Sequence, residues 1–131
     1  MFTRLHNPLR GLTLSAGGTG MDVFMRAATV AAFAPLAIQW AAILAFVVPR
    51  LGTLHFLRLH YTAAQGIDWV DVWYAIFLFP IIGLAVFAVN LALALWLGKR
   101  NRLLGRVVIS ATVFIEGILA VSGIIAVLLN G

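Results

Sequence analysis

The sequence predicts an all-α fold: an integral membrane bundle of three helices with a short interfacial loop on its outer side. The first observation is compositional, since 63% of the 131 residues are hydrophobic, 10% are charged and the mean hydropathy is +1.08. Soluble domains carry about 45–50% apolar and about 25% charged residues. The second observation is that three nearly uncharged stretches each reach the roughly 20 residues that a helix needs to cross about 30 Å of hydrocarbon. Most of the chain lies in these stretches, so we expect one membrane domain, residues 24–131.

The three predicted spans lie near residues 27–48, 73–97 and 107–129. The first two contain no Asp, Glu, Lys or Arg, and the third contains a single charge, Glu116. A carboxylate at a helix centre costs about 2.5–3.5 kcal/mol, whereas each Leu, Ile, Val or Phe contributes about 0.3–0.6 kcal/mol to insertion. The third span has fourteen such apolar residues, so we expect it to insert despite Glu116.

Residues 1–23 are predicted to form a flexible cytoplasmic leader, because the stretch is polar and ends in the Gly-rich run at residues 15–20. The leader lacks the apolar region of 7 to 15 residues that defines a secretory signal. Met21 opens the apolar pattern, which makes it a second candidate for the true start beside Met1.

Basic residues predict the orientation, since Lys and Arg resist translocation. Seven flank the proposed cytoplasmic side and two the proposed outer side. The cytoplasmic set comprises Arg4, Arg10, Arg26, Lys99, Arg100, Arg102 and Arg106, and the outer set comprises Arg50 and Arg58. We therefore expect a multi-pass protein of the cytoplasmic (inner) membrane with its N-terminus inside and its C-terminus outside.

The segment between Arg50 and Asp71 is too short and too charged to span, yet it is rich in Leu and aromatic residues. We expect it to lie on the outer leaflet, either as a short amphipathic helix or as an extended, strand-like piece. Its candidate interaction residues are His55, Arg58, His60, Tyr61, Asp68 and Trp69.

Metal binding by this loop is not favoured. Imidazole and carboxylate groups are suitable ligands, but the spacing of the His and Asp residues matches no compact zinc signature. We expect Asp68 and Asp71 to cap the start of the second helix instead. No metal or other cofactor is predicted.

Three polar residues within the spans are predicted to form a cluster: Gln39, Asn90 and Glu116. Counted at about 1.5 Å per residue from the inner helix ends, they fall in one layer, at roughly 18, 10 and 14 Å. Gln39 and Asn90 are then expected to hydrogen-bond to Glu116, which burial would keep neutral. We favour a packing role for this cluster over the alternative, in which Glu116 carries a proton or a cation.

The third span places Thr112, Glu116, Ala120 and Gly123 on one face. Small and polar residues mark the faces by which membrane helices associate, so we expect this stripe to be buried. Pro35 and Pro80 lie within the predicted spans, where a missing N–H and a ring clash are expected to kink the helix.

The basic turn after the second span is expected to contact lipid head groups, at about 1 kcal/mol per basic residue. It comprises Lys99, Arg100, Arg102 and Arg106. The run is too short for a nucleic-acid site, so no nucleic-acid partner is expected.

No phosphate-binding loop, nucleophile elbow or metalloprotease motif occurs, so we do not expect an enzyme. We predict an accessory or assembly subunit that acts through helix packing, with the lipid bilayer and other membrane subunits, or further copies of itself, as partners. The alternative is an oligomeric transporter or channel subunit, for small ions or coupled to protons, that uses Glu116.

One set of residues resembles a pattern of small bacterial polytopic membrane proteins of unknown function. It comprises Leu59-His60-Tyr61, Gly66-Ile67-Asp68-Trp69, Trp73-Tyr74, Pro80, Gly83 and Asn90. The resemblance covers about residues 50–130 and includes the basic turn at Lys99. It implies an integral membrane protein and no particular activity.

Overall fold

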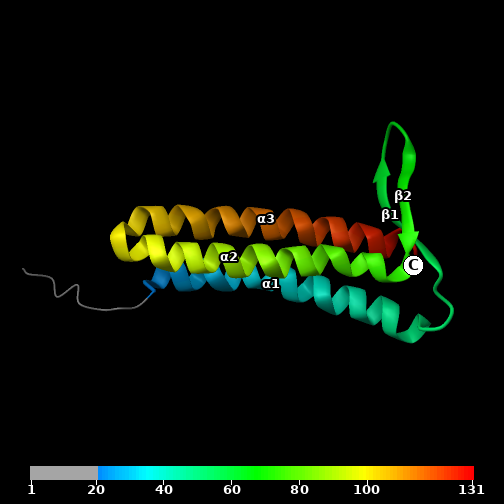
Figure 1. The fold of residues 1–131 in the computed structure, drawn as a ribbon, viewed down its shortest axis with the longest axis horizontal. Coiled ribbons are helices and arrows are strands. Elements are labelled where there is room, and N and C mark those ends of the chain that lie inside the picture. The colour runs from blue at the N-terminus through cyan, green and yellow to red at the C-terminus, as the bar shows by residue number, and fades with distance from the viewer. Residues whose placement is uncertain (1–20) are drawn as a thin grey trace, which may run out of the picture.

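The computed structural model describes residues 21–131 and contains three long helices packed side by side (Figure 1). The helices are α1 (Val23–Val47), α2 (Leu78–Arg100) and α3 (Arg102–Leu128). Together with short flanking turns, each is long and apolar enough to cross a membrane. The predicted helical membrane bundle is therefore confirmed, and the chain is a multi-pass membrane protein. The predicted leader lies almost wholly outside the described residues.

The bundle has two distinct ends, which Figure 1 shows at opposite sides of the view. At one end, called here the turn end, α1 begins and α2 passes into α3. At the other, the hairpin end, a small sheet and the C-terminal Gly131 are found. Residue 21 and Gly131 thus lie at opposite ends of the bundle, as three crossings require.

A single residue, Asn101, connects α2 and α3, so the predicted connection over residues 98–106 is wrong. The backbone of Asn101 is extended, and its N–H donates to the Leu97 carbonyl oxygen. Its side-chain oxygen accepts from the Leu103 N–H at 2.9 Å and caps α3. Because Lys and Arg are good helix formers, the basic run continues both helices instead of forming a loop.

Glycines bring α2 and α3 into close contact at the turn end. A Cβ atom on Gly105 would lie 2.7 Å from the Ala94 carbonyl oxygen and 2.9 Å from the Gly98 Cα. Small residues of this kind let membrane helices approach closely. The contact also fixes the register, with Ala94 of α2 opposite Gly105 of α3.

The loop at the hairpin end forms an antiparallel two-stranded sheet, β1 (Phe56–Thr62) and β2 (Gly66–Val72). Of the two predicted conformations the extended one is confirmed, and the amphipathic helix is wrong. The burial of β1 alternates, with Leu57 and Leu59 buried between exposed neighbours, as expected for a strand with one face on a core. Gly66 opens β2 at a φ of +75°, a conformation that favours glycine.

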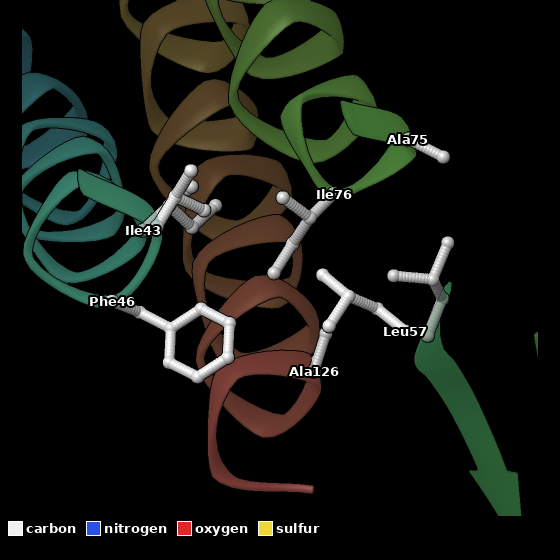
Figure 2. Packing of buried hydrophobic residues seen from close by; sticks show 8 residues of the cluster. Ile43, Phe46, Leu57, Ala75, Ile76 and Ala126 are labelled. Atoms are coloured by element: carbon white, nitrogen blue, oxygen red, sulfur yellow. The ribbon is translucent and has the colours of Figure 1, made fainter. Parts of the chain in front are cut away.

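Leu57 and Leu59 connect the sheet to the bundle. They share a buried cluster with Ile76 and with α1 and α3 side chains (Figure 2). The other labelled members of this cluster are Ile43, Phe46, Ala75 and Ala126. The hairpin is therefore packed onto the ends of all three spanning segments.

The start of α2 differs from the expectation. Asp68 and Asp71 both lie in β2, so neither caps a helix. A 3-10 turn, η3 (Trp73–Phe77), leads into α2 without any side-chain cap. The two aspartates belong to the strand because its pairing with β1 extends up to Val72, and this pairing overrides the local capping signal.

The two prolines play different parts. Pro35 lies inside α1, and α1 changes direction near its middle (Figure 1), in agreement with the expected kink. Pro80 lies in the first turn of α2, where backbone N–H groups have no partner within the helix. The expected kink at Pro80 is therefore wrong, because the ring sits where it disturbs no helical hydrogen bond.

Candidate functional site

Glu116 lies on the buried face of α3, in the interior of the bundle. The predicted stripe of Thr112, Glu116, Ala120 and Gly123 is buried along its whole length. The Glu116 side chain is 0% exposed. Neither of its carboxyl oxygens has a hydrogen-bond partner among residues 21–131.

The carboxyl group occupies space that α2 leaves open by having a glycine. A Cβ atom on Gly83 would lie 2.9 Å from the Glu116 Oε2 and 3.1 Å from the Leu36 Cδ1. The Glu116 carboxyl group therefore lies against Gly83, with the Leu36 side chain also beside this glycine. These two residues are apolar, and no hydrogen bond among residues 21–131 compensates the buried acid.

Gln39 of α1 is also fully buried, but it binds a backbone group. Its Nε2 donates to the Leu119 carbonyl oxygen at 2.7 Å, and its side chain lies against Gly123. Its Oε1 has no partner among the described residues. Gln39 thus joins α1 to α3 one turn away from Glu116.

Asn90 lies apart from the other two residues. Gly83 is opposite Glu116 and Ala94 opposite Gly105, and the same register puts Asn90 opposite Ile109. Ile109 is seven residues, about 10 Å, from Glu116 along α3. The Asn90 side chain is half-buried and makes no hydrogen bond within residues 21–131.

The predicted hydrogen-bonded layer of Gln39, Asn90 and Glu116 is therefore wrong. The depth count assumed a nine-residue connection after the second span, whereas α2 and α3 extend to Asn101. That error shifts the levels of residues on the two helices relative to each other. Gln39 and Glu116 are both buried in the interior, as expected, but no hydrogen bond joins them.

The predicted interaction residues at the hairpin end divide between the hairpin and its base. His60 Nδ1 lies 2.6 Å from Asp68 Oδ1 across the two strands. Trp69 donates its indole N–H to Asp71 Oδ2 at 3.3 Å, and its ring lies 6.2 Å from the Phe79 ring. Tyr61 is exposed near the tip. His55 lies before β1, where its carbonyl oxygen accepts from the Trp73 N–H.

The hairpin offers no metal centre. Across residues 21–131 no group of three His, Cys, Asp or Glu side chains is placed to hold a metal ion. His60 and Asp68 form an isolated pair, with side chains 55% and 28% exposed.

Asn130 joins the end of α3 to the hairpin, a contact that the sequence did not reveal. Its Nδ2 donates to the Arg58 and Ala126 carbonyl oxygens, both at 2.7 Å, and its Oδ1 accepts from the Arg58 N–H at 3.0 Å. The side chain therefore pairs with the free edge of β1 as a neighbouring strand would. No local pattern predicts this contact, because the two residues are 72 positions apart.

At the turn end, Arg106 is paired with Asp22. Its Nη2 and Nε donate to Asp22 Oδ2 at 2.7 and 3.1 Å. Asp22 also caps α1, since its Oδ1 accepts from the Met25 N–H at 2.8 Å. The Met25 hydrogen bond and then Arg106 lower the pKa of the Asp22 carboxyl group. An Asp directly before an apolar run was a visible capping signal.

The other predicted head-group residues, Lys99, Arg100 and Arg102, are exposed. The Arg100 guanidinium lies over the Trp96 ring, 4.8 Å from its centroid. One of the three exposed cations thus lies on an aromatic ring, and the head-group role of all three stays a prediction.

Comparisons with protein families, curated proteins and solved structures find no match for the chain. The resemblance to small bacterial membrane proteins stays a prediction.

Proposed function

We propose that this protein is an accessory or assembly subunit of a complex in the cytoplasmic (inner) membrane. The observation that carries the proposal is the hairpin, which is held in a fixed position while one of its faces is left open. Asn130 pairs with the edge of β1, and Leu57 and Leu59 anchor the sheet in the bundle core. A rigid, uncovered surface outside the bundle suits contact with another protein.

The exposed face of the hairpin has residue types that are common in protein–protein interfaces. Phe56 and Val70 are 70% and 56% exposed, and they lie beside Arg58 and the His60–Asp68 pair. Interfaces commonly combine an aromatic and an Arg anchor with a polar rim. Phe56, Arg58, Val70 and Asn130 also line a surface hollow next to the C-terminus.

Two surface hollows among residues 21–131, one beside the C-terminus and one on α3, are lined by neither Gln39 nor Glu116.

Site-specific photocrosslinking in native membranes tests the subunit proposal. A photoreactive residue at Val70, on the open face, should give an adduct with one membrane protein of defined mass. The same residue at Phe114, which is 75% exposed on α3, serves as the control and should give mainly lipid adducts. Absence of any protein adduct at Val70, with the chain migrating alone on native gels, would overturn the proposal.

A second candidate function is proton or cation transport by an oligomer, and the uncompensated Glu116 carboxyl group favours it. Intramembrane acids commonly mark proton or ion pathways, and a carboxyl group without a fixed partner is free to exchange its proton or bind a cation.

Flux measurements separate the two functions. Purified protein in liposomes should move protons down an imposed gradient if Glu116 carries them, and Glu116→Gln should abolish that flux. Ser122→Ala on the same helix is the matched control and should leave it unchanged. Equal flux in the Glu116→Gln variant, or no flux in the unmodified protein, would eliminate the transport candidate.

A further inference from the structure

The two faces of the hairpin differ in chemistry. Leu57 pairs with Asp71, and Tyr61 pairs with Ile67, while the register is irregular at His60, whose Cα partner is Trp69. The Trp69 indole donates to Asp71, and its ring lies 6.2 Å from the Phe79 ring, so Trp69 shares the face of Leu57 and Asp71. Strand alternation adds Leu59, Tyr61 and Ile67 to this face. We call this the aromatic face: Leu57, Leu59, Tyr61, Ile67, Trp69 and Asp71. The opposite, polar face carries Phe56, Arg58, His60, Thr62, Asp68 and Val70. The Trp69–Asp71 and His60–Asp68 hydrogen bonds agree with this assignment.

The inner half of the aromatic face is directed towards the helices. Leu57 and Leu59 are each 2% exposed against the bundle. Trp69 lies beside Phe79, in the first turn of α2. This face is therefore continuous with the apolar surface of the spanning helices.

The outer half of the same face continues past the helices and is uncovered. Figure 1 shows the hairpin standing across the bundle axis and projecting beyond α3. Tyr61 and Ile67 near the tip are 54% and 41% exposed. Since the helices cross the membrane, a hairpin set across their axis runs along the membrane surface. Its outer half then lies over lipid and not over protein.

We infer that the aromatic face docks onto the leaflet at the hairpin end, with Tyr61, Ile67 and Trp69 in the head-group region and the polar face in water. Tyr and Trp favour this depth because their rings are apolar and their polar atoms reach water. The single acid on the face, Asp71, is already engaged by the Trp69 indole and the Val72 N–H. No uncompensated charge thus opposes the docking.

Lipid contact also accounts for the stability of the hairpin. An isolated two-stranded sheet is marginal in water, and a hydrophobic face that is covered is needed to hold it. The bundle covers only the inner half of the aromatic face. Docking on the leaflet covers the remainder, so the strands should be ordered to their tip in a bilayer.

Spin labels read the two faces separately, and the chain contains no cysteine to interfere. Ile67→Cys and Tyr61→Cys report on the aromatic face, and Val70→Cys is the matched control on the polar face. Each purified, nitroxide-labelled variant is placed in vesicles of phosphatidylcholine and phosphatidylglycerol. Collision rates with oxygen, which partitions into lipid, and with a nickel chelate, which stays in water, are then compared.

The ratio of oxygen to nickel collisions should be several-fold higher at positions 67 and 61 than at position 70. In detergent-free buffer with an amphipathic polymer replacing lipid, the difference should shrink. Equal ratios on both faces would overturn the proposal, because the hairpin would then stand in water. Protection of position 67 from both reagents would also overturn it, since protein and not lipid would cover the face. Neither result depends on whether a partner subunit exists.

Discussion

At the scale of single residues, the central feature is an acid buried without a partner. An unsatisfied polar group in a protein interior costs about 1–3 kcal/mol, and Glu116 has two such oxygens. Thr112 in the same stripe is buried too, but its hydroxyl donates to the Val108 carbonyl oxygen at 2.9 Å. Burial of the Glu116 carboxyl group therefore lowers the free energy of unfolding, and no hydrogen bond among residues 21–131 offsets this loss.

Replacing Glu116 with methionine should consequently stabilise the bundle by about 1–3 kcal/mol. Thermal unfolding in detergent micelles measures this change. Thr112→Val, which removes a satisfied hydroxyl, is the control and should be neutral or slightly destabilising. A less stable Glu116→Met protein would mean that the acid contributes to packing after all.

Gly105 should tolerate no side chain, because a Cβ atom there meets the backbone of α2. Gly105→Ala is expected to destabilise the bundle by about 1–3 kcal/mol, as overpacking does. Gly117 on the same helix has no atom within 4 Å of its hypothetical Cβ. Gly117→Ala should thus be neutral or gain up to about 1 kcal/mol from helix propensity. Unfolding in increasing SDS distinguishes the two, and equal effects would contradict the close contact.

Much of the buried surface could be read from the sequence, but its hydrogen bonds could not. The stripe containing Glu116 followed from helical periodicity alone, because small and polar residues recur every three or four positions. The partner of Gln39 is a backbone carbonyl on another helix, and its choice depends on the register between α1 and α3. If α1 were shifted by one helical turn along α3, the Gln39 side chain would lie beside Glu116 and not beside the Leu119 carbonyl oxygen.

At the scale of elements, two polar side chains fasten the ends of the bundle. Asp22 joins the start of α1 to Arg106 of α3 at the turn end. Asn130 joins the end of α3 to β1 at the hairpin end. Each fixes a terminus of the apolar region to a distant segment, so each should control local opening more than global stability.

The Asp22 contact should make stability depend on pH in one direction. Its pKa is lower in the folded protein than the ordinary value of 3.8. The stabilisation is then fully present above that ordinary value and is lost as the pH falls through the folded pKa. Unfolding temperatures should be insensitive to Asp22 between neutrality and about pH 5 and should fall below about pH 4.

The Asp22→Asn variant provides the control for this pH effect. Its asparagine still caps α1 but carries no charge for Arg106. It should be less stable than the unmodified protein at neutral pH, and the difference should vanish in acid. A constant difference at every pH would contradict the assignment to the carboxylate.

Asn130→Asp should release the edge of β1, because aspartate cannot donate to the Arg58 and Ala126 carbonyl oxygens. Hydrogen–deuterium exchange should then rise over residues 56–62, while α2 stays protected. Gln65→Ala, in the turn between the strands, is the control and should leave exchange near Arg58 unchanged. Unaltered exchange in Asn130→Asp would show that Leu57 and Leu59 hold the hairpin without it.

At the scale of the whole molecule, the distribution of charged and apolar residues determines how the helices cross the membrane. The three spans and their alternating directions followed from composition, since few other structures can bury so much apolar surface. The ends of the helices could not be predicted from composition, because the basic run at Lys99 was interpreted as a loop and is helical. Loop conformation also depended on tertiary contacts, as the pairing of Asn130 with Arg58 shows.

Opposite placement of the two ends yields a topology prediction. A reporter fused after Gly131 should be active outside the cytoplasm, and one fused before Phe24 should be active inside it. Replacing Lys99, Arg100 and Arg102 with glutamine should weaken this preference, because they supply much of the inner charge. Both reporters active on one side of the membrane would be incompatible with three crossings.

The one-residue connection at Asn101 couples the rotational phase of α3 to that of α2. Each residue added to a helix rotates the residues that follow it by about 100° around the helix axis. The connection at Asn101 has no flexible loop that could absorb this rotation. Inserting one alanine beside Asn101 would therefore swing the Glu116 carboxyl group out towards the hydrocarbon tails. An insertion of two helical turns, in contrast, would return the Glu116 side chain to its original direction around the α3 axis but would change its depth in the membrane.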